Sequence, residues 1–161
     1  MKDSRRSDRE LAGILEVSQP TVSRVRERLK KEGYLREFTV IPDFRRLGFE
    51  IGAIILVSLK KTLTGAEIKK AQEISQKDMS EKAPDEIVLF SRGIGGGYTG
   101  VIVSFHKNYS DFTRLLDRIR EYDFVDPVSI MTFIMDLNDK VQYRYFTFAT
   151  LAKYLMSMQE E

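Results

Sequence analysis

The chain has 161 residues and no cysteine, with 26 Lys and Arg against 24 Asp and Glu, and a single His. These counts exclude disulfides, thiolate metal sites, a cysteine nucleophile and motifs that place two imidazoles on one metal. The 42% of hydrophobic and 31% of charged residues are typical of a folded globular protein. The longest uninterrupted apolar run, 53–57, is far below the ~20 residues of a membrane span. We therefore expect a soluble, cytoplasmic protein without a membrane partner.

The charge is distributed unevenly along the chain. Residues 1–46 hold 12 Lys and Arg against 8 Asp and Glu, so this part is basic, while the remainder is slightly acidic. A basic first third indicates a surface that contacts nucleic acid. The alternative is a solvated helix surface of mixed charge, because a net charge of this size produces only a modest field.

Two short helices are predicted in the first 35 residues. Ser7 and Glu10 fit a capping box that opens a helix ending near Glu16. Ser18 is the expected cap of a second helix, with Pro20 in its first turn, where the missing amide does no harm. Two capped helices joined by a tight turn, the second of them basic, predict a helix-turn-helix.

The second helix carries the candidate DNA contacts. Val22, Val25 and Leu29 recur at helical spacing and are expected to form the buried stripe. On the opposite face, Arg24 has the paired donors that read guanine, and Gln19 has the amide that reads adenine. Thr21 and the other basic residues suit phosphates, and the alternative is a charged, solvated helix. The candidate DNA-binding residues are Gln19, Pro20, Thr21, Ser23, Arg24, Arg26, Arg28 and Lys30.

The second region alternates strand and helix signals. A β-branched apolar run at 49–59 predicts a strand, and a capping box at Thr64 predicts a helix that extends to about residue 82. Strands at 86–92 and 98–106 follow, then a helix that Ser110 is expected to cap, a last strand at 128–135 and an aromatic-rich C-terminal helix at 141–158. The order β-α-β-β-α-β predicts a ferredoxin-like domain, so the chain is of the α+β class.

A glycine-rich hairpin joins the two middle strands of this pattern. Residues 95–100 also match G-x-G-x-x-G, but a strand follows them where a dinucleotide site needs a helix. Three consecutive glycines lose much entropy on ordering, so we expect a subunit contact or a ligand cleft; the alternative is a wide, mobile turn. The residues assigned to this contact are Arg92, Gly95, Gly96, Gly97, Tyr98 and Thr99. The lone His106 is expected to be structural. We predict no catalytic residue, no metal site and no cofactor.

Three segments carry a family resemblance: 7–12 (SDRELA), 17–24 (VSQPTVSR) and 29–35 (LKKEGYL). They resemble the reading head of the Lrp/AsnC (feast/famine) transcriptional regulators, and the resemblance covers about residues 2–137. It implies a winged helix-turn-helix that binds specific DNA sequences, dimers joined through the C-terminal domain, higher homo-oligomers, and control by a small-molecule effector such as an amino acid.

Two departures from the family pattern affect these expectations. The family has a further helix before the motif, and this chain begins in the loop that follows it. Without that helix, four apolar side chains are expected to be exposed unless the C-terminal helix covers them: Leu11, Leu15, Val25 and Leu29. Where the family often has Gly-x-x-Asp before its third strand, residues 96–99 end in Thr.

The predicted organisation is a helix-turn-helix DNA-binding domain at 1–36, an extended linker at 37–47, a ferredoxin-like effector and assembly domain at 48–138 and a C-terminal helical extension at 139–161. The predicted function is a sequence-specific DNA-binding regulator that is not an enzyme. Two alternatives remain: a siroheme-decarboxylase-like enzyme subunit of the same architecture, and an assembly protein without DNA binding.

Overall fold

The structure is a computed structural model that describes residues 6–36, 40–81, 86–141 and 150. It divides into two compact units, with the boundary between Pro42 and Asp43. The predicted C-terminal helix lies outside the described residues except for positions 141 and 150, as does most of the extended segment predicted around 37–41. Within the described ranges, no helix combines the length and the apolar character that a bilayer crossing requires.

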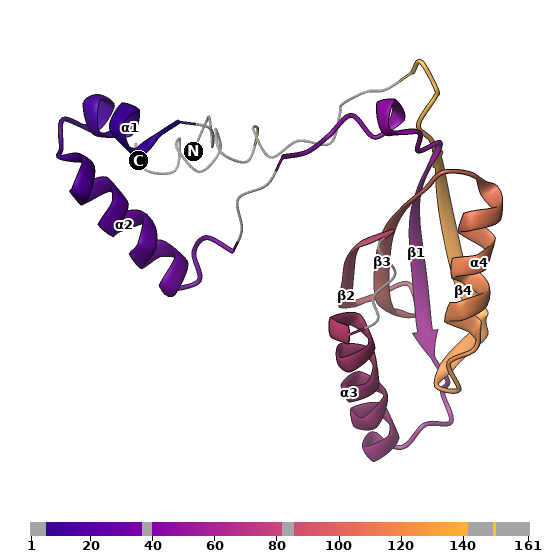
Figure 1. Ribbon diagram of the computed structural model, residues 1–161. Helices are drawn as coiled ribbons and strands as arrows, with labels where there is room; N and C mark the ends of the chain where they lie inside the picture. The colour runs from indigo at the N-terminus through magenta and orange to yellow at the C-terminus, as the bar shows by residue number, and fades with distance from the viewer. Residues whose placement is uncertain (1–5, 37–39, 82–85, 142–149, 151–161) are drawn as a thin grey trace. The chain divides into compact units, whose positions relative to one another are not determined.

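The described part of the N-terminal unit contains the helices α1 (Asp8–Leu15) and α2 (Gln19–Lys31), drawn in indigo and purple in Figure 1. The predicted capping box is present, since the Glu10 amide donates to Ser7 Oγ at 3.2 Å and the Ser7 amide donates to Glu10 Oε2 at 2.7 Å. Glu16 ends α1 in the left-handed conformation, with φ of 54°. Ser18 caps α2 by accepting the Thr21 amide at 3.3 Å. The helix boundaries predicted from caps are thus confirmed.

The described residues of this unit bury few side chains. Among them, Ala12 and Val22 are the buried hydrophobic residues, at 8% and 7% exposure, and Leu29 is half-buried. The prediction that Val25 belongs to the buried stripe is wrong, because its side chain is 42% exposed. Helix α1 covers one narrow stripe of α2, and Val25 lies beside that stripe.

The second unit is built on an antiparallel sheet. Its strands are β1 (Ile51–Leu59), β2 (Ile87–Gly95), β3 (Tyr98–His106) and β4 (Val125–Asp136), in the spatial order β2-β3-β1-β4. The central strand β1 pairs with β3 and with β4. This is the order of a ferredoxin-like sheet, so the predicted α+β class and the βαββαβ pattern are confirmed.

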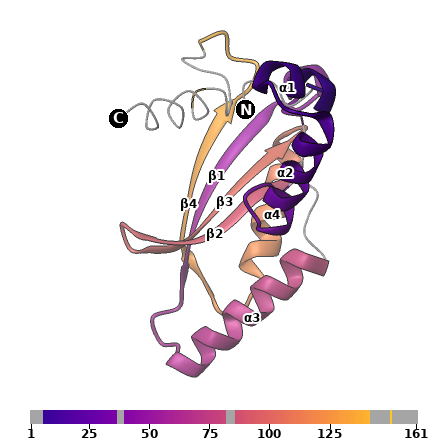
Figure 2. The same ribbon diagram turned by 90° about the vertical axis from the view of Figure 1, so that its left-hand side faces the viewer.

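Two helices cover one face of the sheet, as Figure 2 shows: α3 (Gly65–Glu81) and α4 (Tyr109–Arg120). The capping box predicted at the start of α3 is present, with the Thr64 amide donating to Glu67 Oε2 at 2.8 Å. The cap predicted at Ser110 is wrong, because Asn108 caps α4 by accepting the Asp111 amide at 2.9 Å. Asn108 lies two residues before Ser110. The helix therefore begins two residues earlier than predicted.

The core lies between the helices and the sheet. It brings apolar side chains of α4, such as Phe112 and Leu115, onto Ile55 of β1 and Ile102 of β3, all of which are at most 5% exposed. Because side chains alternate along a strand, the neighbours of Ile55 point to the other face. Burial of these residues supplies most of the favourable energy of the second unit.

The other face of the sheet carries apolar side chains, and neither of the two described helices α3 and α4 lies on it. Strand register places Ile54 beside Val103 and Phe133, and the neighbouring row of described residues, Val101, Leu56 and Met131, is equally apolar. Phe133 is 62% exposed and Met131 is 47% exposed. One end of this face is covered by Phe44, whose ring stacks on Phe105 at 3.9 Å before the short helix η1 (Arg45–Leu47). A sheet face of this composition needs a partner.

Candidate nucleic-acid interface

The outer side of α2 is exposed and basic. The helix contains five Lys and Arg residues and one Glu. Of the eight candidate DNA contacts, six are exposed: Gln19, Pro20, Thr21, Arg24, Arg28 and Lys30. The cap at Ser18 fixes the first turn of α2, so it presents Gln19 and Thr21 at a defined position on the surface.

The exposed cations of α2 differ in their partners. Arg28 lies 3.8 Å from Glu32, an exposed pair that adds little to stability. Arg24 and Lys30 form no ion pair with any part of the chain that the structure describes. Both are therefore available to an external anion, Arg24 in the second turn and Lys30 in the last turn of the helix.

Ser23 and Arg26 are directed toward α1 and are half-buried. Ser23 Oγ donates to Asp8 Oδ2 at 2.5 Å, and Arg26 Nη1 lies 2.5 Å from Asp8 Oδ1. Arg26 also donates to the carbonyl of Arg6 at 3.4 Å. Asp8 therefore links the first turn of α1 to the middle of α2, through a charge-assisted hydrogen bond from Ser23 and an ion pair with Arg26. We name these three residues the Asp8 cluster: Asp8, Ser23 and Arg26.

Sequence reasoning did not find the Asp8 cluster. In the sequence, Asp8 was only an unassigned position inside the capping box of Ser7 and Glu10. The pairing with Arg26 depends on the angle between two helices, which periodicity along one helix does not report. The available signal was an acidic residue at the start of α1 followed by a strongly basic second helix.

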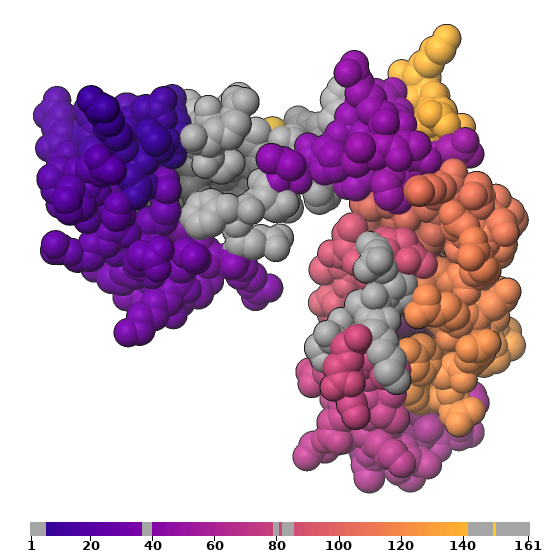
Figure 3. Space-filling model, viewed as in Figure 1, coloured from indigo at the N-terminus to yellow at the C-terminus, as the bar shows by residue number. Residues whose placement is uncertain are grey.

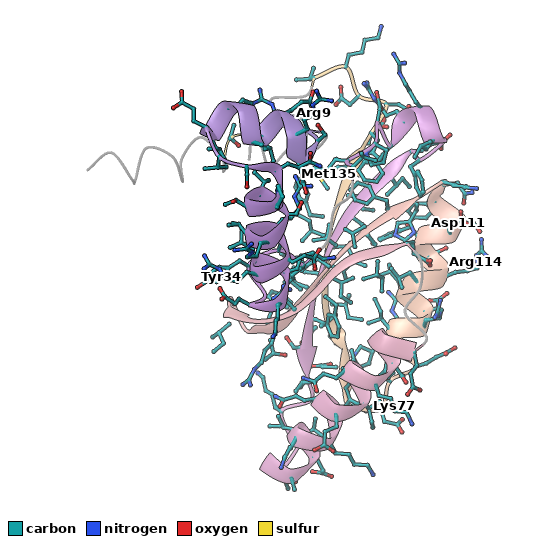
Figure 4. All side chains as sticks on the ribbon, turned by 60° about the vertical axis from the view of Figure 1, so that its left-hand side comes forward. Arg9, Tyr34, Lys77, Asp111, Arg114 and Met135 are labelled. Carbon is teal, nitrogen blue, oxygen red and sulfur yellow. The ribbon has the colours of Figure 1, made fainter. Side chains whose placement is uncertain are left out.

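An apolar surface lies on the same unit. Leu15 is 61% exposed and Val25 is 42% exposed. Of the two expectations for Val25, the exposure that follows from a missing covering helix agrees with the structure, and burial in the stripe does not. The other two residues in that expectation, Leu11 and Leu29, are only half-exposed because the two helices shield each other. Ile14 adds to this surface at 56% exposure. Tyr34 projects from the turn that follows α2 (Figure 4).

The glycine hairpin is a tight turn anchored to the end of β1. Gly96 and Gly97 have φ of 56° and 88°, and Gly95 pairs with Tyr98 across them. Two of the three glycines are therefore required by positive φ. Ser58 Oγ donates to the carbonyl of Gly97 at 2.7 Å.

Two of the hairpin's candidate contact residues differ in their surroundings. Thr99 Oγ1 accepts the amide of Leu59 at 3.3 Å, so this hydroxyl is engaged by the backbone of β1. Arg92 is exposed on β2 opposite Gly100, and it forms no ion pair within the described ranges. Ile94 is 95% exposed at the tip. The assignment of this hairpin to a ligand or subunit contact stays a prediction.

His106 is buried at the end of β3, with 1% exposure. Its Nε2 lies 2.8 Å from Ser104 Oγ, while Nδ1 has no hydrogen-bond partner among the described residues. The ring meets Phe112 edge-on at 5.5 Å. Burial lowers the pKa of His106, and the charges of Glu86 and Asp111 act in the opposite direction. The position is that of a core residue.

Two acidic residues, one at the end of β4 and one just after it, form turns. Asp136 Oδ1 accepts the Asn138 amide and Asp139 Oδ1 accepts the Val141 amide, both at 2.8 Å. This is the turn function that Asp side chains commonly have. The described residues contain no cluster of His and acidic side chains that would hold a metal ion.

Comparison with known sequences finds regulators. An uncharacterised HTH-type transcriptional regulator of Pyrococcus abyssi is 26% identical over 126 residues, which are 78% of this chain and 78% of that protein. Another, from Pyrococcus horikoshii, is 42% identical over 59 residues, which are 37% of this chain and 39% of that protein. No family model matches the chain. These relatives are named as regulators, so they bear out the prediction that the chain is not an enzyme.

Comparison with solved structures identifies the fold. The crystal structure of that P. horikoshii protein has a TM-score of 0.67 at 22% identity, over 90% of this chain and 89% of that one. AsnC of Escherichia coli has a TM-score of 0.64 at 20% identity, over 89% of this chain and 88% of that one. A Neisseria meningitidis transcriptional regulator, crystallised with L-Met, has a TM-score of 0.65 at 15% identity, over 91% of this chain and 88% of that one. The resemblance predicted from the sequence motifs is confirmed.

Proposed function

We propose that this chain, an Lrp/AsnC-type protein by its fold and by its sequence relatives, is a transcriptional regulator that binds duplex DNA with the first half of α2 in the major groove. The observation that carries the proposal is the exposed, capped start of α2, which presents Gln19 and Arg24 to solvent. Arg24 has no acidic partner within the described ranges, so DNA binding breaks no existing ion pair of this side chain. We place the protein in the cytoplasm.

The proposed contacts divide into base contacts and phosphate contacts. Arg24 reads guanine through its paired donors and Gln19 reads adenine through its amide. Arg28 and Lys30, farther along the helix, neutralise phosphates and so position the helix without reading sequence. The remaining candidates in the first turn, Pro20 and Thr21, contact the backbone of the duplex.

Ser23 and Arg26 were also predicted from the sequence as DNA contacts of α2. We propose instead that they support DNA binding indirectly. Their hydrogen bond and ion pair with Asp8 fix the angle between α1 and α2. A recognition helix whose angle is fixed before binding loses less conformational entropy when it enters the groove. Both residues therefore support binding by holding α2 in place.

The test compares two alanine variants of α2 on a selected duplex and on random duplex at two salt concentrations. We expect Arg24→Ala to lose about 1–3 kcal/mol on the selected duplex and to relax sequence preference. We expect Lys30→Ala to weaken both duplexes similarly and to reduce the salt slope by about one. Arg120→Ala, on α4 of the other unit, is the matched control. An unchanged sequence preference of the Arg24 variant removes this residue from base recognition.

We also propose that the second unit assembles into a homodimer, or a higher homo-oligomer, through the open face of its sheet. The support is the row of exposed apolar side chains on that face, including Met131 and Phe133. A second copy is a fitting partner, because an isologous contact sets the same apolar patch against itself. Light scattering of Phe133→Lys is expected to show monomers, while Val128→Lys on the same strand keeps the wild-type mass. A monomeric wild-type chain at micromolar concentration contradicts the proposal.

We further propose that an effector controls DNA binding and that it binds at the glycine hairpin. The exposed guanidinium of Arg92 and the backbone amides of Gly96 and Gly97 suit a carboxylate. The regulator of N. meningitidis, crystallised with L-Met, favours an amino acid as the effector. We expect Gly96→Val to abolish the response of DNA binding to added amino acids, because Val is strained at φ of 56°. A wild-type response in this variant excludes the hairpin from effector binding.

A further inference from the structure

A cavity of about 120 Å³ lies in the second unit between α3, α4 and the sheet. Figure 3 faces the side of the unit where α3 and α4 lie. The floor of the cavity is apolar and includes Ile102 of β3 and Leu115 of α4. Its rim carries four polar side chains from α3, from α4 and from the turn after α4: Ser75, Asp78, Arg118 and Tyr122. DNA binding and assembly, as proposed above, use none of these four.

The cavity exists because α3 packs lightly on the sheet. Among the α3 side chains that the structure describes, Ala71 alone is fully buried, at 3% exposure. In the second half of the helix, Asp78 accepts a hydrogen bond from the Tyr122 hydroxyl at 2.9 Å. This bond holds α3 beside the end of α4 without filling the space between the helices and the sheet. Well-packed interiors contain few spaces of this size, so the cavity is available for a ligand.

The rim carries one carboxylate, Asp78, and one cation, Arg118, and the cation is the group that suits an anionic head group. Asp78 is already engaged by Tyr122, which satisfies part of its capacity to accept hydrogen bonds. Burial and the bond to Asp78 raise the pKa of Tyr122, so its hydroxyl stays protonated at neutral pH. Arg118 is exposed and forms no ion pair within the described ranges. Its fork of donors matches a carboxylate in geometry and charge.

We propose that this cavity binds a small carboxylic acid whose hydrocarbon part enters the apolar floor and whose carboxylate pairs with Arg118. The volume limits the size of the ligand, because an apolar protein cavity of roughly 150 Å³ accommodates benzene. The hydrocarbon part is therefore no larger than one six-membered ring or a short branched chain. This site is separate from the glycine hairpin and does not depend on the DNA-binding proposal.

The test uses the full chain and benzoate as the probe, with benzyl alcohol and benzylamine as neutral and cationic counterparts. We expect benzoate to shift the amide NMR signals of α4 and β3 and to bind at least about tenfold more tightly than either counterpart. Arg118→Gln is expected to remove this preference. Arg114→Gln is the matched control, since Arg114 lies on the same helix, pairs with Asp111 and is outside the cavity lining (Figure 4).

Three results overturn the proposal. Equal affinity for the three probes means that no carboxylate is recognised, and preference for benzylamine means that Asp78 selects the ligand. Absence of shifts at millimolar benzoate means that the cavity is a packing void. Ser75→Phe supplies an independent check, because a ring at this position fills the cavity and is expected to abolish benzoate binding. Benzoate binding that survives in this variant places the ligand elsewhere.

Discussion

The two units are stabilised by different interactions. In the described part of the helical unit, Ala12 and Val22 are buried, a cap stabilises the start of each helix, and the Asp8 cluster links the two helices. In the sheet unit, α4 packs a continuous apolar core against β1 and β3, with Phe112 at 1% exposure. Polar interactions fix geometry but contribute little net energy, whereas burial contributes much. The unit that is proposed to contact DNA therefore gains less from burial among its described residues, so its few polar contacts make up a larger share of its stability.

The largest change in unfolding free energy is expected when a side chain is removed from the core of the sheet unit. Phe112→Ala removes a fully buried ring and is expected to cost about 3–5 kcal/mol of unfolding free energy. Urea unfolding, followed by amide NMR signals that resolve the two units, measures the loss. Ile94→Ala, at a side chain that is 95% exposed, is the control and is expected to change the value by less than about 0.5 kcal/mol. Equal losses in these two variants contradict the assigned core.

In the helical unit, the next largest loss of stability is expected when the Asp8 cluster is disrupted. Asp8→Asn removes the charge that engages Ser23 and Arg26, and we expect a loss of about 1–2 kcal/mol confined to α1 and α2. DNA affinity is expected to fall with it, because the angle of α2 is no longer fixed. Asp117→Asn is the control, since it breaks an exposed pair with Arg120 at 3.0 Å, whose contribution is at most about 0.5 kcal/mol. A smaller loss at Asp8 than at Asp117 contradicts the role of the cluster.

A smaller, pH-dependent effect is expected at His106. Burial places its pKa in the folded chain below the value of about 6.5 in the unfolded chain. Below pH 6.5 the unfolded chain therefore binds more protons than the folded one, so the stability present above that pH is lost as the pH falls. When the pH falls from 7.5 to 5.5, the unfolding free energy of the sheet unit is expected to decrease by up to about 1 kcal/mol more in the wild type than in His106→Gln. Parallel pH profiles for the two proteins contradict this expectation.

The smallest effect is expected on the apolar surface of the helical unit. Leu15→Gln replaces a side chain that is 61% exposed, and the unfolding free energy is expected to change by less than about 0.5 kcal/mol. Val22→Gln, at a buried position of the same unit, is the matched comparison and is expected to unfold α1 and α2. A loss above 1 kcal/mol for the Leu15 variant means that another part of the assembled protein covers this surface.

Local signals in the sequence predicted local structure well. The caps at Ser7, Ser18 and Thr64 were predicted because each rests on residues at most three positions apart. Strand β3 was predicted with its observed bounds, since a glycine turn marks its start. The cap at Asn108 was missed because Ser110, two residues later, is an equally good cap by residue type.

Features that depend on contacts between distant residues were not predictable. The pairing of Asp8 with Arg26 requires the angle between two helices, and the exposure of Val25 requires knowledge of what α1 fails to cover. The cavity beside Tyr122 depends on how lightly α3 packs, which its own periodicity does not reveal. The candidate DNA residues followed from helical spacing, but spacing alone did not separate Arg24, which points to solvent, from Arg26, which points to α1.

The central position of β1 has a consequence for synthesis of the chain. This apolar strand, Ile51–Leu59, pairs with β3 and with β4, and β4 ends only at Asp136. At a synthesis rate of ~5–20 residues per second, the roughly 77 residues from Leu59 to Asp136 take about 4–15 s to be added. During that interval β1 has at least one unpaired edge, and a β-branched run of this kind is prone to intermolecular pairing. The order of strands therefore makes the nascent chain depend on chaperones or on fast folding of β1 with β3, before β4 is complete.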